Sequence, residues 1–191
     1  MSKHKKLSDT ELIKLISRFD SRALEEIYER YSALFFTLVK KVVKDDDAAE
    51  NVLIEIFSIL WKKSDRFDAE KDSAFTWLVT LARNKAVDFI KRSRSDELAE
   101  YDDTYEDYFI IPCLSNQIDS LDIKTAKNIK PQIKWAFDNL TDAQKYVIEL
   151  AYFEGRNIEE ISGQLNIPVE TVRSKITTAL QNLKENLLGG E

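Results

Sequence analysis

Hydrogen-bonding and cationic side chains are concentrated near the C-terminus of this chain. They are Thr171, Arg173, Ser174, Lys175, Thr177 and Thr178. Arginine is the commonest reader of guanine edges in the major groove of DNA, whereas lysine and threonine more often hold phosphates. The chemistry that these groups offer is therefore reversible recognition of DNA. The solvated face of a helical hairpin would give the same pattern, and helical periodicity alone favours that simpler interpretation.

Three predicted helices position these side chains. Thr141 and Gln144 have capping-box spacing, and Asn157 and Glu160 indicate a second helix N-terminus. Pro168 disfavours helical backbone in the residue before it and so predicts a tight turn. The last helix carries apolar residues at helical spacing, namely Val172, Ile176, Leu180, Leu183 and Leu187. Recognition of the major groove needs a short helix, a turn and a second helix with a polar face. This arrangement makes DNA binding and a solvated helical hairpin equally good interpretations of the segment.

The N-terminal half of the chain is also helical. Apolar residues recur at helical spacing over 12–16, 24–42 and 52–61. A polar segment over 64–72 precedes another helix, predicted over 73–93. The outward face of that helix carries Arg83, Asn84, Lys85, Lys91, Arg92 and Arg94. No strand-like alternation competes with these helices, so the predicted fold class is all-α.

An acidic segment separates the two helical parts. Between residues 95 and 123 the chain has nine acids and no Lys or Arg. The predicted architecture is two helical domains, at 1–94 and 131–191, joined by an acidic linker at 95–130. Because aromatic residues are mixed with the acids, the linker could lie in a basic channel or fold onto a partner. A solvated tether between the domains explains the same composition equally well.

Composition excludes several kinds of chemistry. The single Cys113 cannot form an internal disulfide, and the single His4 gives metal binding or histidine catalysis little material. We therefore expect no catalytic residue, no metal site and no cofactor. No apolar run reaches ~18 residues, so we expect no direct insertion into a membrane. The N-terminus lacks the apolar core of a signal peptide, which predicts a cytoplasmic location.

Two segments, in a defined order, resemble one protein family. The C-terminal segment contains Glu159-Glu160-Ile161 and the run from Leu165 to Lys175. The N-terminal segment contains Arg66-Phe67-Asp68 and the run from Phe75 to Asp88, after Glu50, Glu55, Phe57, Leu60 and Trp61. They resemble regions 4 and 2 of the extracytoplasmic-function (group 4) sigma factors of bacterial RNA polymerase. Both motifs in this order are much more specific than either alone.

The resemblance implies an alternative sigma factor that binds core RNA polymerase, recognises the −35 and −10 promoter elements and promotes DNA opening. Region 2 of this family binds the clamp helices of the largest polymerase subunit and the single-stranded −10 element. Region 4 binds the duplex −35 element and the flap of the second-largest subunit. The implied partners are core polymerase, promoter DNA and an anti-sigma factor, and the acidic linker would follow a basic path through polymerase.

The resemblance also assigns three sets of site residues. The −35 set is Thr171, Arg173, Ser174, Lys175, Thr177 and Thr178. The −10 set is Phe67, Phe75, Arg83, Asn84, Lys85 and Arg92. The set that would bind core polymerase is Asp47, Glu50, Asn51, Ile54 and Glu55.

The −10 set contains residues that could hold an unpaired base. The amide of Asn84 can donate to and accept from a base edge, and the two phenylalanines could stack on a base. Structural alternatives remain for several of these residues. At least one of Phe75 and Trp77 is expected in the core, and Arg83 and Lys85 could simply be solvated.

The sequence departs from the family pattern in two places. Ala48, Asn51 and Ile54 stand where the family usually has acidic, acidic and amide residues, although acids at 45–47 could compensate. The pair Thr177-Thr178 stands where bulkier or basic residues are common, which indicates a different −35 preference.

Two other functional classes are alternatives to the sigma factor. One is a helix-turn-helix regulator that binds DNA without polymerase, and polymerase dependence of promoter binding separates the two. The other is an enzyme, which the residues disfavour because no His-rich, Cys-rich or Gly-rich phosphate site is present and no carboxylate pair stands out from the helical surface charge.

Overall fold

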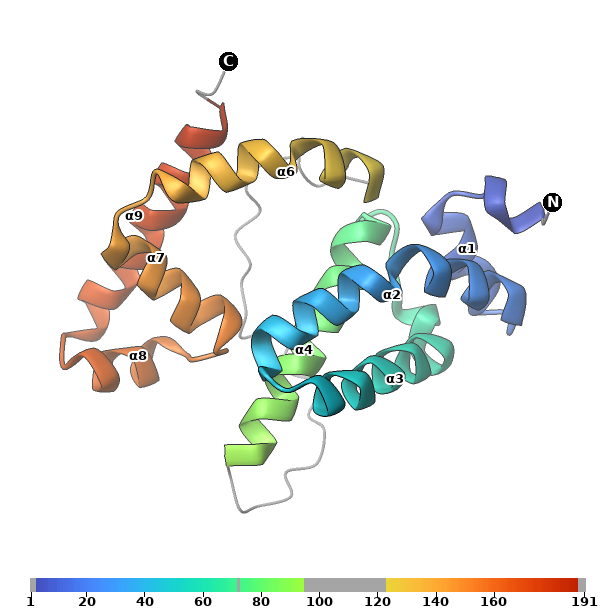
Figure 1. Ribbon diagram of the computed structural model, residues 1–191, viewed down its shortest axis with the longest axis horizontal. Coiled ribbons are helices and arrows are strands. Elements are labelled where there is room, and N and C mark those ends of the chain that lie inside the picture. The colour runs from blue at the N-terminus through green and yellow to red at the C-terminus, as the bar shows by residue number, and fades with distance from the viewer. Residues whose placement is uncertain (1–2, 72, 95–122, 189–191) are drawn as a thin grey trace. The chain divides into compact units, whose positions relative to one another are not determined.

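The computed structural model describes residues 3–71, 73–94 and 123–188 (Figure 1). These residues form helices and no strand, which confirms the predicted all-α class with two helical domains. The described part of the chain falls into two compact units, unit 1 at 3–94 and unit 2 at 124–188. Most of the predicted acidic linker, including Cys113, lies outside the described residues.

Unit 1 is built from helices whose N-termini are capped by acidic or hydroxyl side chains. Its elements are η1 (Lys3–Lys6), α1 (Asp9–Ile16), α2 (Ser21–Val43), α3 (Asp46–Lys63), η2 (Ser64–Arg66) and α4 (Ala74–Arg94). Ser8 forms a capping box with Glu11, and Asp20 and Asp45 accept hydrogen bonds from the first turns of α2 and α3. Lys44 ends α2 in the left-handed conformation, so that α3 returns alongside α2 (Figure 1).

The core of unit 1 lies among α2, α3 and α4. Helix α2 packs against both of the others, and α3 also contacts α4. The fully buried side chains include Tyr31, Phe35 and Val39 of α2, Ile56 and Leu60 of α3, and Leu78, Ala82 and Ala86 of α4. This packing fixes which faces of α3 and α4 remain available to partners.

Charged side chains tie the N-terminal segment to α2. The Arg30 guanidinium donates to Oδ1 of Asp9 at 2.6 Å and to Oε1 of Glu26 at 2.9 Å. The Nε2 atom of His4 lies 3.0 Å from Oδ2 of Asp20, the residue that caps α2. The segment before α2 is therefore held by ionic contacts in addition to the apolar core.

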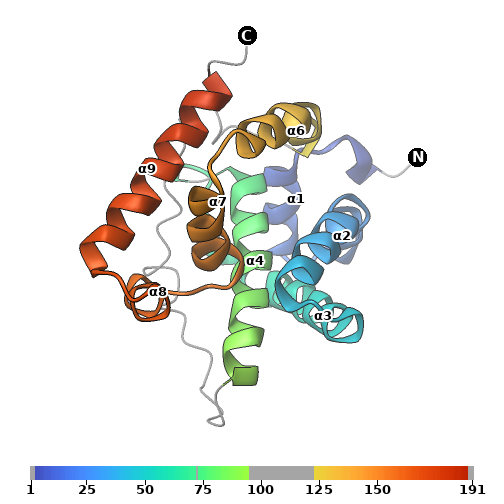
Figure 2. The same cartoon turned by 60° about the vertical axis from the view of Figure 1, so that its left-hand side comes forward.

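Unit 2 contains the predicted short helices and the predicted long C-terminal helix. Its elements are α6 (Ile123–Asp138), α7 (Asp142–Ile148), the π-helical turn η3 (Glu149–Phe153), α8 (Ile158–Leu165) and α9 (Val169–Leu188). The capping box expected at Thr141 and Gln144 is present, and the helix start expected at Asn157 is also closed by a capping box, with Glu160. Helix α7 lies beside α9, and α8 packs near the beginning of α9 (Figure 2).

Helix α6 begins earlier than the domain boundary predicted at residue 131. It starts at Ile123 and contains Pro131 within it. The sequence pattern missed these first turns because few apolar residues recur at a fixed period before the proline. The side-chain amide of Asn186 on α9 donates to the carbonyl of Ala136 at 3.0 Å, which joins α6 to α9.

The core of unit 2 takes only Val172 of the predicted apolar stripe as a fully buried residue, while Ile176, Leu180, Leu183 and Leu187 are partly buried. Leu150, Ile161 and Val172 form a buried cluster, with Ile176 packed against it. Ala179 of α9 is also fully buried, and the neighbouring Leu180, which the sequence placed in the core, is only partly buried.

Candidate nucleic-acid interface

The turn between α8 and α9 fixes where α9 begins. Asn166 ends α8 in the left-handed conformation, with φ 51°. The Ser162 hydroxyl donates to the carbonyl of Ile167 at 2.6 Å, and the N–H of Ile167 donates to the carbonyl of Ser162 at 3.2 Å. The N–H of Val172 donates to the carbonyl of Pro168 at 3.2 Å, which starts the first turn of α9. With Val172 buried, the polar residues that follow it point outward.

All six residues of the predicted −35 set lie on α9. Arg173, Ser174, Lys175, Thr177 and Thr178 are exposed, and Thr171 is partly buried. The Nε atom of Arg173 lies 3.7 Å from Oε1 of Glu170, but both side chains are more than half exposed. Such an exposed pair contributes little, so it does not hold Arg173 away from an external partner.

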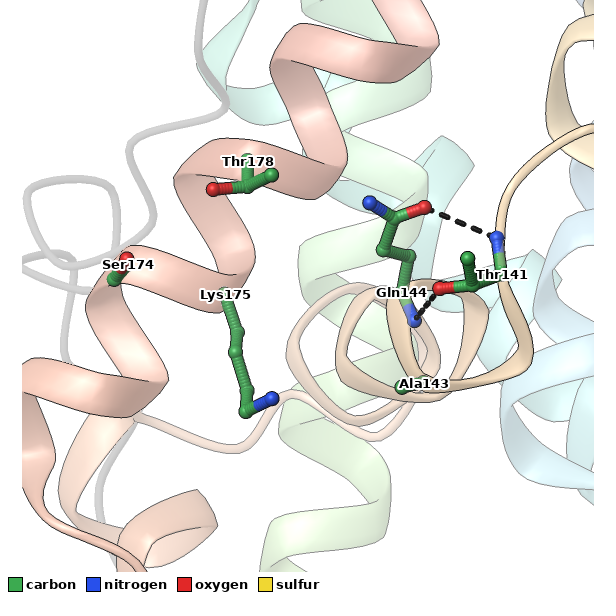
Figure 3. Close-up of a pocket in the computed structure, with 6 residues that line it drawn as sticks. All are labelled: Thr141, Ala143, Gln144, Ser174, Lys175 and Thr178. Carbon is green, nitrogen blue, oxygen red and sulfur yellow. Dashed lines mark hydrogen bonds between the residues drawn. The ribbon is translucent and has the colours of Figure 1, made fainter.

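Part of this polar face lines a shallow cavity of about 220 Å³ between α9 and α7 (Figure 3). Helix α9 contributes Ser174, Lys175 and Thr178, and the start of α7 contributes Thr141, Ala143 and Gln144. Figure 3 shows the Lys175 side chain extended toward the first turn of α7. An ammonium group beside hydroxyl groups suits a phosphate oxygen. Arg173 is not among the residues that line this cavity.

Two cations that were expected on the outward face of α4 are buried instead. The exposed fraction is 1% for Arg83 and 6% for Lys85. The Nζ atom of Lys85 lies 2.7 Å from Oε2 of Glu55 on α3 and 3.5 Å from Oδ2 of Asp88. Arg83 donates to Oδ1 of Asn84 at 3.1 Å. The sequence pattern predicted solvent exposure because charged residues are rarely buried unless they are paired, and here Lys85 is paired with two carboxylates.

The two remaining polar residues of the −10 set, Asn84 and Arg92, are partly buried on α4. Arg92 pairs with Asp88 one helical turn away, and its side chain is 35% exposed. Because Asp88 contacts both Arg92 and Lys85, it joins two members of the predicted −10 set.

The aromatic residues of the −10 set each contact another ring. The rings of Phe67 and Trp77 lie 5.4 Å apart, and those of Phe75 and Tyr31 lie 6.3 Å apart. Phe67, Phe75 and Trp77 are all partly buried. Since Tyr31 is fully buried, the contact directs Phe75 toward the core, whereas Phe67 and Trp77 form a pair beside the loop that precedes α4.

The predicted polymerase-binding set forms an exposed face of α3. Asp47, Glu50, Asn51, Ile54 and Glu55 are all exposed. Ile54 is 68% exposed and lies among these carboxylates. An apolar residue surrounded by carboxylates is complementary to a partner with basic and apolar side chains.

Sequence reasoning missed several residues around these sites. Thr141 and Gln144 were identified only as caps, and nothing local indicated that they line a cavity with α9. The contacts of the Asp88 carboxylate with both Lys85 and Arg92 were also missed. Its i,i+4 spacing to Arg92 could have indicated one of these two pairs.

Among the described residues, no group of three or more His, Cys, Asp or Glu residues could hold a metal ion. None of the described helices is long and apolar enough to cross a membrane.

Comparison with known families gives two matches, which cover separate parts of the chain. Residues 27–95 match the family model described as Sigma-70 region 2, and residues 136–185 match Sigma-70, region 4. Together the two ranges cover more than half of the 191 residues.

Individual proteins match over nearly the whole chain. ECF RNA polymerase sigma factor SigK of Mycobacterium bovis (strain BCG / Pasteur 1173P2) is 28% identical over 176 residues, which covers 92% of this chain and 91% of that protein. SigK of Mycobacterium sp. (strain JLS) is 27% identical over 179 residues, covering 93% and 89%. The crystal structure of Rhodobacter sphaeroides SigE in complex with the anti-sigma ChrR matches with 25% identity and a TM-score of 0.46, covering 93% and 96%.

Proposed function

Because this chain belongs to the sigma-70 family and is an extracytoplasmic-function sigma factor for transcription initiation, we propose that its two units divide promoter recognition between them. Unit 2 contacts the duplex −35 element through α9. Unit 1 binds polymerase through α3 and the opened −10 strand through α4 and the loop before it. The acidic segment between them follows a basic path through polymerase. The observation that carries this proposal is the exposed polar face of α9, held by a capped helix-turn-helix.

Within α9, base contacts and phosphate contacts are divided between two cations. Arg173 lies outside the cavity beside α7 and is exposed, which suits a guanine edge or its flanking phosphate. Lys175 lines that cavity with two hydroxyl residues, Ser174 and Thr178, which suits a phosphate. Thr177 completes the exposed surface that faces the groove.

Neutral polar and aromatic groups of unit 1 bind the −10 strand together with cations of α4. Opening DNA costs a few kcal/mol per extruded base, and the protein must recover that energy by binding the strand. Asn84 offers an amide to a base edge, and the Phe67–Trp77 pair offers an apolar wall for a base. Arg92, with a partly exposed side chain, supplies a phosphate contact.

The exposed face of α3 binds the clamp helices of the largest polymerase subunit. Its carboxylates attract basic side chains, and Ile54 supplies an apolar anchor where the family usually has an amide. The flap of the second-largest subunit binds unit 2. An anti-sigma factor, which the resemblance to this group implies, would compete with polymerase for these surfaces in the cytoplasm.

Run-off transcription with purified core polymerase tests the proposal. We expect core polymerase with this chain to initiate at a defined class of promoters, and sequencing of the transcript starts then gives the −10 and −35 elements. A polymerase-independent regulator would instead bind its DNA equally well without polymerase. Initiation that does not change when the chain is added would contradict the proposed function.

A further inference from the structure

Two residues with different proposed partners form an ion pair inside unit 1. Glu55 belongs to the α3 face assigned to polymerase, and Lys85 belongs to the α4 surface assigned to the −10 strand. The Nζ atom of Lys85 and Oε2 of Glu55 are 2.7 Å apart. The Lys85 side chain is 7% exposed, whereas that of Glu55 is 51% exposed. The carboxylate is therefore accessible from outside while it contacts a buried ammonium group.

The other carboxylate near Lys85 is a weaker partner. Oδ2 of Asp88 lies 3.5 Å from the lysine and also pairs with Arg92. A buried ammonium that has lost its water needs a close carboxylate. Glu55 is the closer of these two acids, so it has the larger influence on where the Lys85 side chain lies.

A polymerase contact would compete for the same carboxylate. Glu55 shares the exposed face of α3 with Asp47 and Glu50, so a partner that binds this face presents basic side chains to it. A guanidinium that reaches Glu55 forms a bidentate pair with both carboxylate oxygens, which a lysine ammonium cannot do. Binding at α3 therefore weakens the hold of Glu55 on Lys85.

We propose that Glu55 is a positioning residue that couples polymerase binding to capture of the opened strand. In the free protein, Glu55 holds Lys85 against α3. In the complex, a basic side chain of polymerase takes the Glu55 carboxylate, and the Lys85 ammonium turns toward the DNA strand. The inference rests on the proposed function, in which α3 binds polymerase and α4 binds the −10 strand. It predicts that the free protein binds the strand more weakly than the complex does.

Chemical reactivity of the lysine tests the release directly. The full chain is treated with an amine-acylating reagent, alone and with core polymerase but without DNA, and modification is measured by mass spectrometry. We expect Lys85 to react slowly in the free chain and faster in the complex, with the 81% exposed Lys71 as internal reference. Continued protection of Lys85 in the complex would overturn the proposal.

A second experiment measures binding of a single-stranded −10 oligonucleotide to the free full chain. Glu55→Gln keeps a carbonyl acceptor for Lys85 but removes the charge, so we expect affinity to rise on the order of fivefold. Adding Lys85→Gln should abolish that gain. Glu25→Gln on α2 removes an equal charge from an exposed position and is the matched control. A merely structural role for Glu55 would lower affinity instead.

The outcomes separate this inference from the proposed function. The coupling would be overturned if Glu55→Gln and Glu25→Gln raised oligonucleotide affinity equally, or if the gain persisted after Lys85→Gln. Either result would indicate a bulk charge effect, and run-off transcription by the unsubstituted chain would still occur. Loss of initiation by the unsubstituted chain with core polymerase would instead contradict the proposed function itself.

Discussion

Lys175 on α9 and Thr141 at the start of α7 line the same cavity. Arg173, two residues before Lys175, is rotated by about 200° around the helix from it and does not line the cavity. The two cations of the −35 set thus have different surroundings. One lies in a groove between helices, and the other lies on the open surface of α9.

This difference predicts different defects for the two alanine variants. Lys175→Ala should weaken binding to all promoter sequences alike and reduce the salt slope of binding by about one, because one phosphate contact is lost. Arg173→Ala should cost ~1–3 kcal/mol on the preferred −35 element and relax specificity at one base pair. Holoenzyme binding to a set of −35 variants at several salt concentrations measures both quantities.

Lys184, on the same helix and exposed, is the control for charge alone. Lys184→Ala removes one positive charge but lies outside the assigned DNA-contacting positions, so it should leave −35 preference unchanged. If neither Arg173→Ala nor Lys175→Ala altered −35-dependent transcription, α9 would not be the DNA-reading element.

A second prediction concerns acid stability of unit 1. A hydrogen bond from His4 and the backbone N–H groups of α2 lower the pKa of Asp20 below its ordinary value of 3.8. A lowered carboxyl pKa stabilises the fold above 3.8, and this contribution is lost as pH falls through the folded-state pKa. Asp20→Asn can still cap α2 but cannot ionise.

The free energy of unfolding, measured from about pH 5 to pH 2, tests whether ionised Asp20 stabilises the fold. The difference between the unsubstituted chain and Asp20→Asn should be largest at the upper end and should shrink toward pH 2. A difference that stays constant over the whole range would show that ionisation of Asp20 does not contribute.

The features that sequence predicted well are those that depend on nearby residues. The capping boxes at Thr141 and Asn157 each involve a residue three positions on, so spacing alone identified them. The helix-turn-helix followed from Pro168 and the apolar period after it. The family resemblance rested on such local motifs, and the matches to both regions agree with it.

The features that sequence predicted wrongly depend on contacts between helices. No residue near Lys85 in the sequence indicated that it would be buried and paired with Glu55 on another helix. Ala179 rather than Leu180 is fully buried, because its position follows Val172 by two full turns on the face that meets the core. The start of α6 was missed because its first turns carry little apolar periodicity, although a contact from Asn186 holds the later part of the helix.

A third prediction concerns the exposed isoleucine on α3. Ile54→Ala should lower affinity for core polymerase by about 1–2 kcal/mol, because an apolar anchor at the centre of an interface is lost. It should change the free energy of unfolding by less than about 0.5 kcal/mol, because the side chain is 68% exposed in the free protein. A competition assay for core polymerase and a denaturant titration measure the two quantities. Equal core affinity of the variant would contradict the assignment of this face to polymerase.

The last prediction asks whether Asn84 contacts DNA or only supports Arg83. Its Oδ1 accepts from the Arg83 guanidinium at 3.1 Å, so Asn84→Ala removes an acceptor from a buried cation as well as an amide from the strand. Asn84→Asp keeps the acceptor and loses the amide donor. If Asn84 captures a base, both variants should lose ~1–3 kcal/mol of −10 discrimination in open-complex formation, with core binding nearly intact. Footprinting of open complexes on matched and substituted −10 elements measures this loss. Full recovery of −10 discrimination in Asn84→Asp, with a defect only in Asn84→Ala, would show that the amide serves Arg83 and does not contact a base.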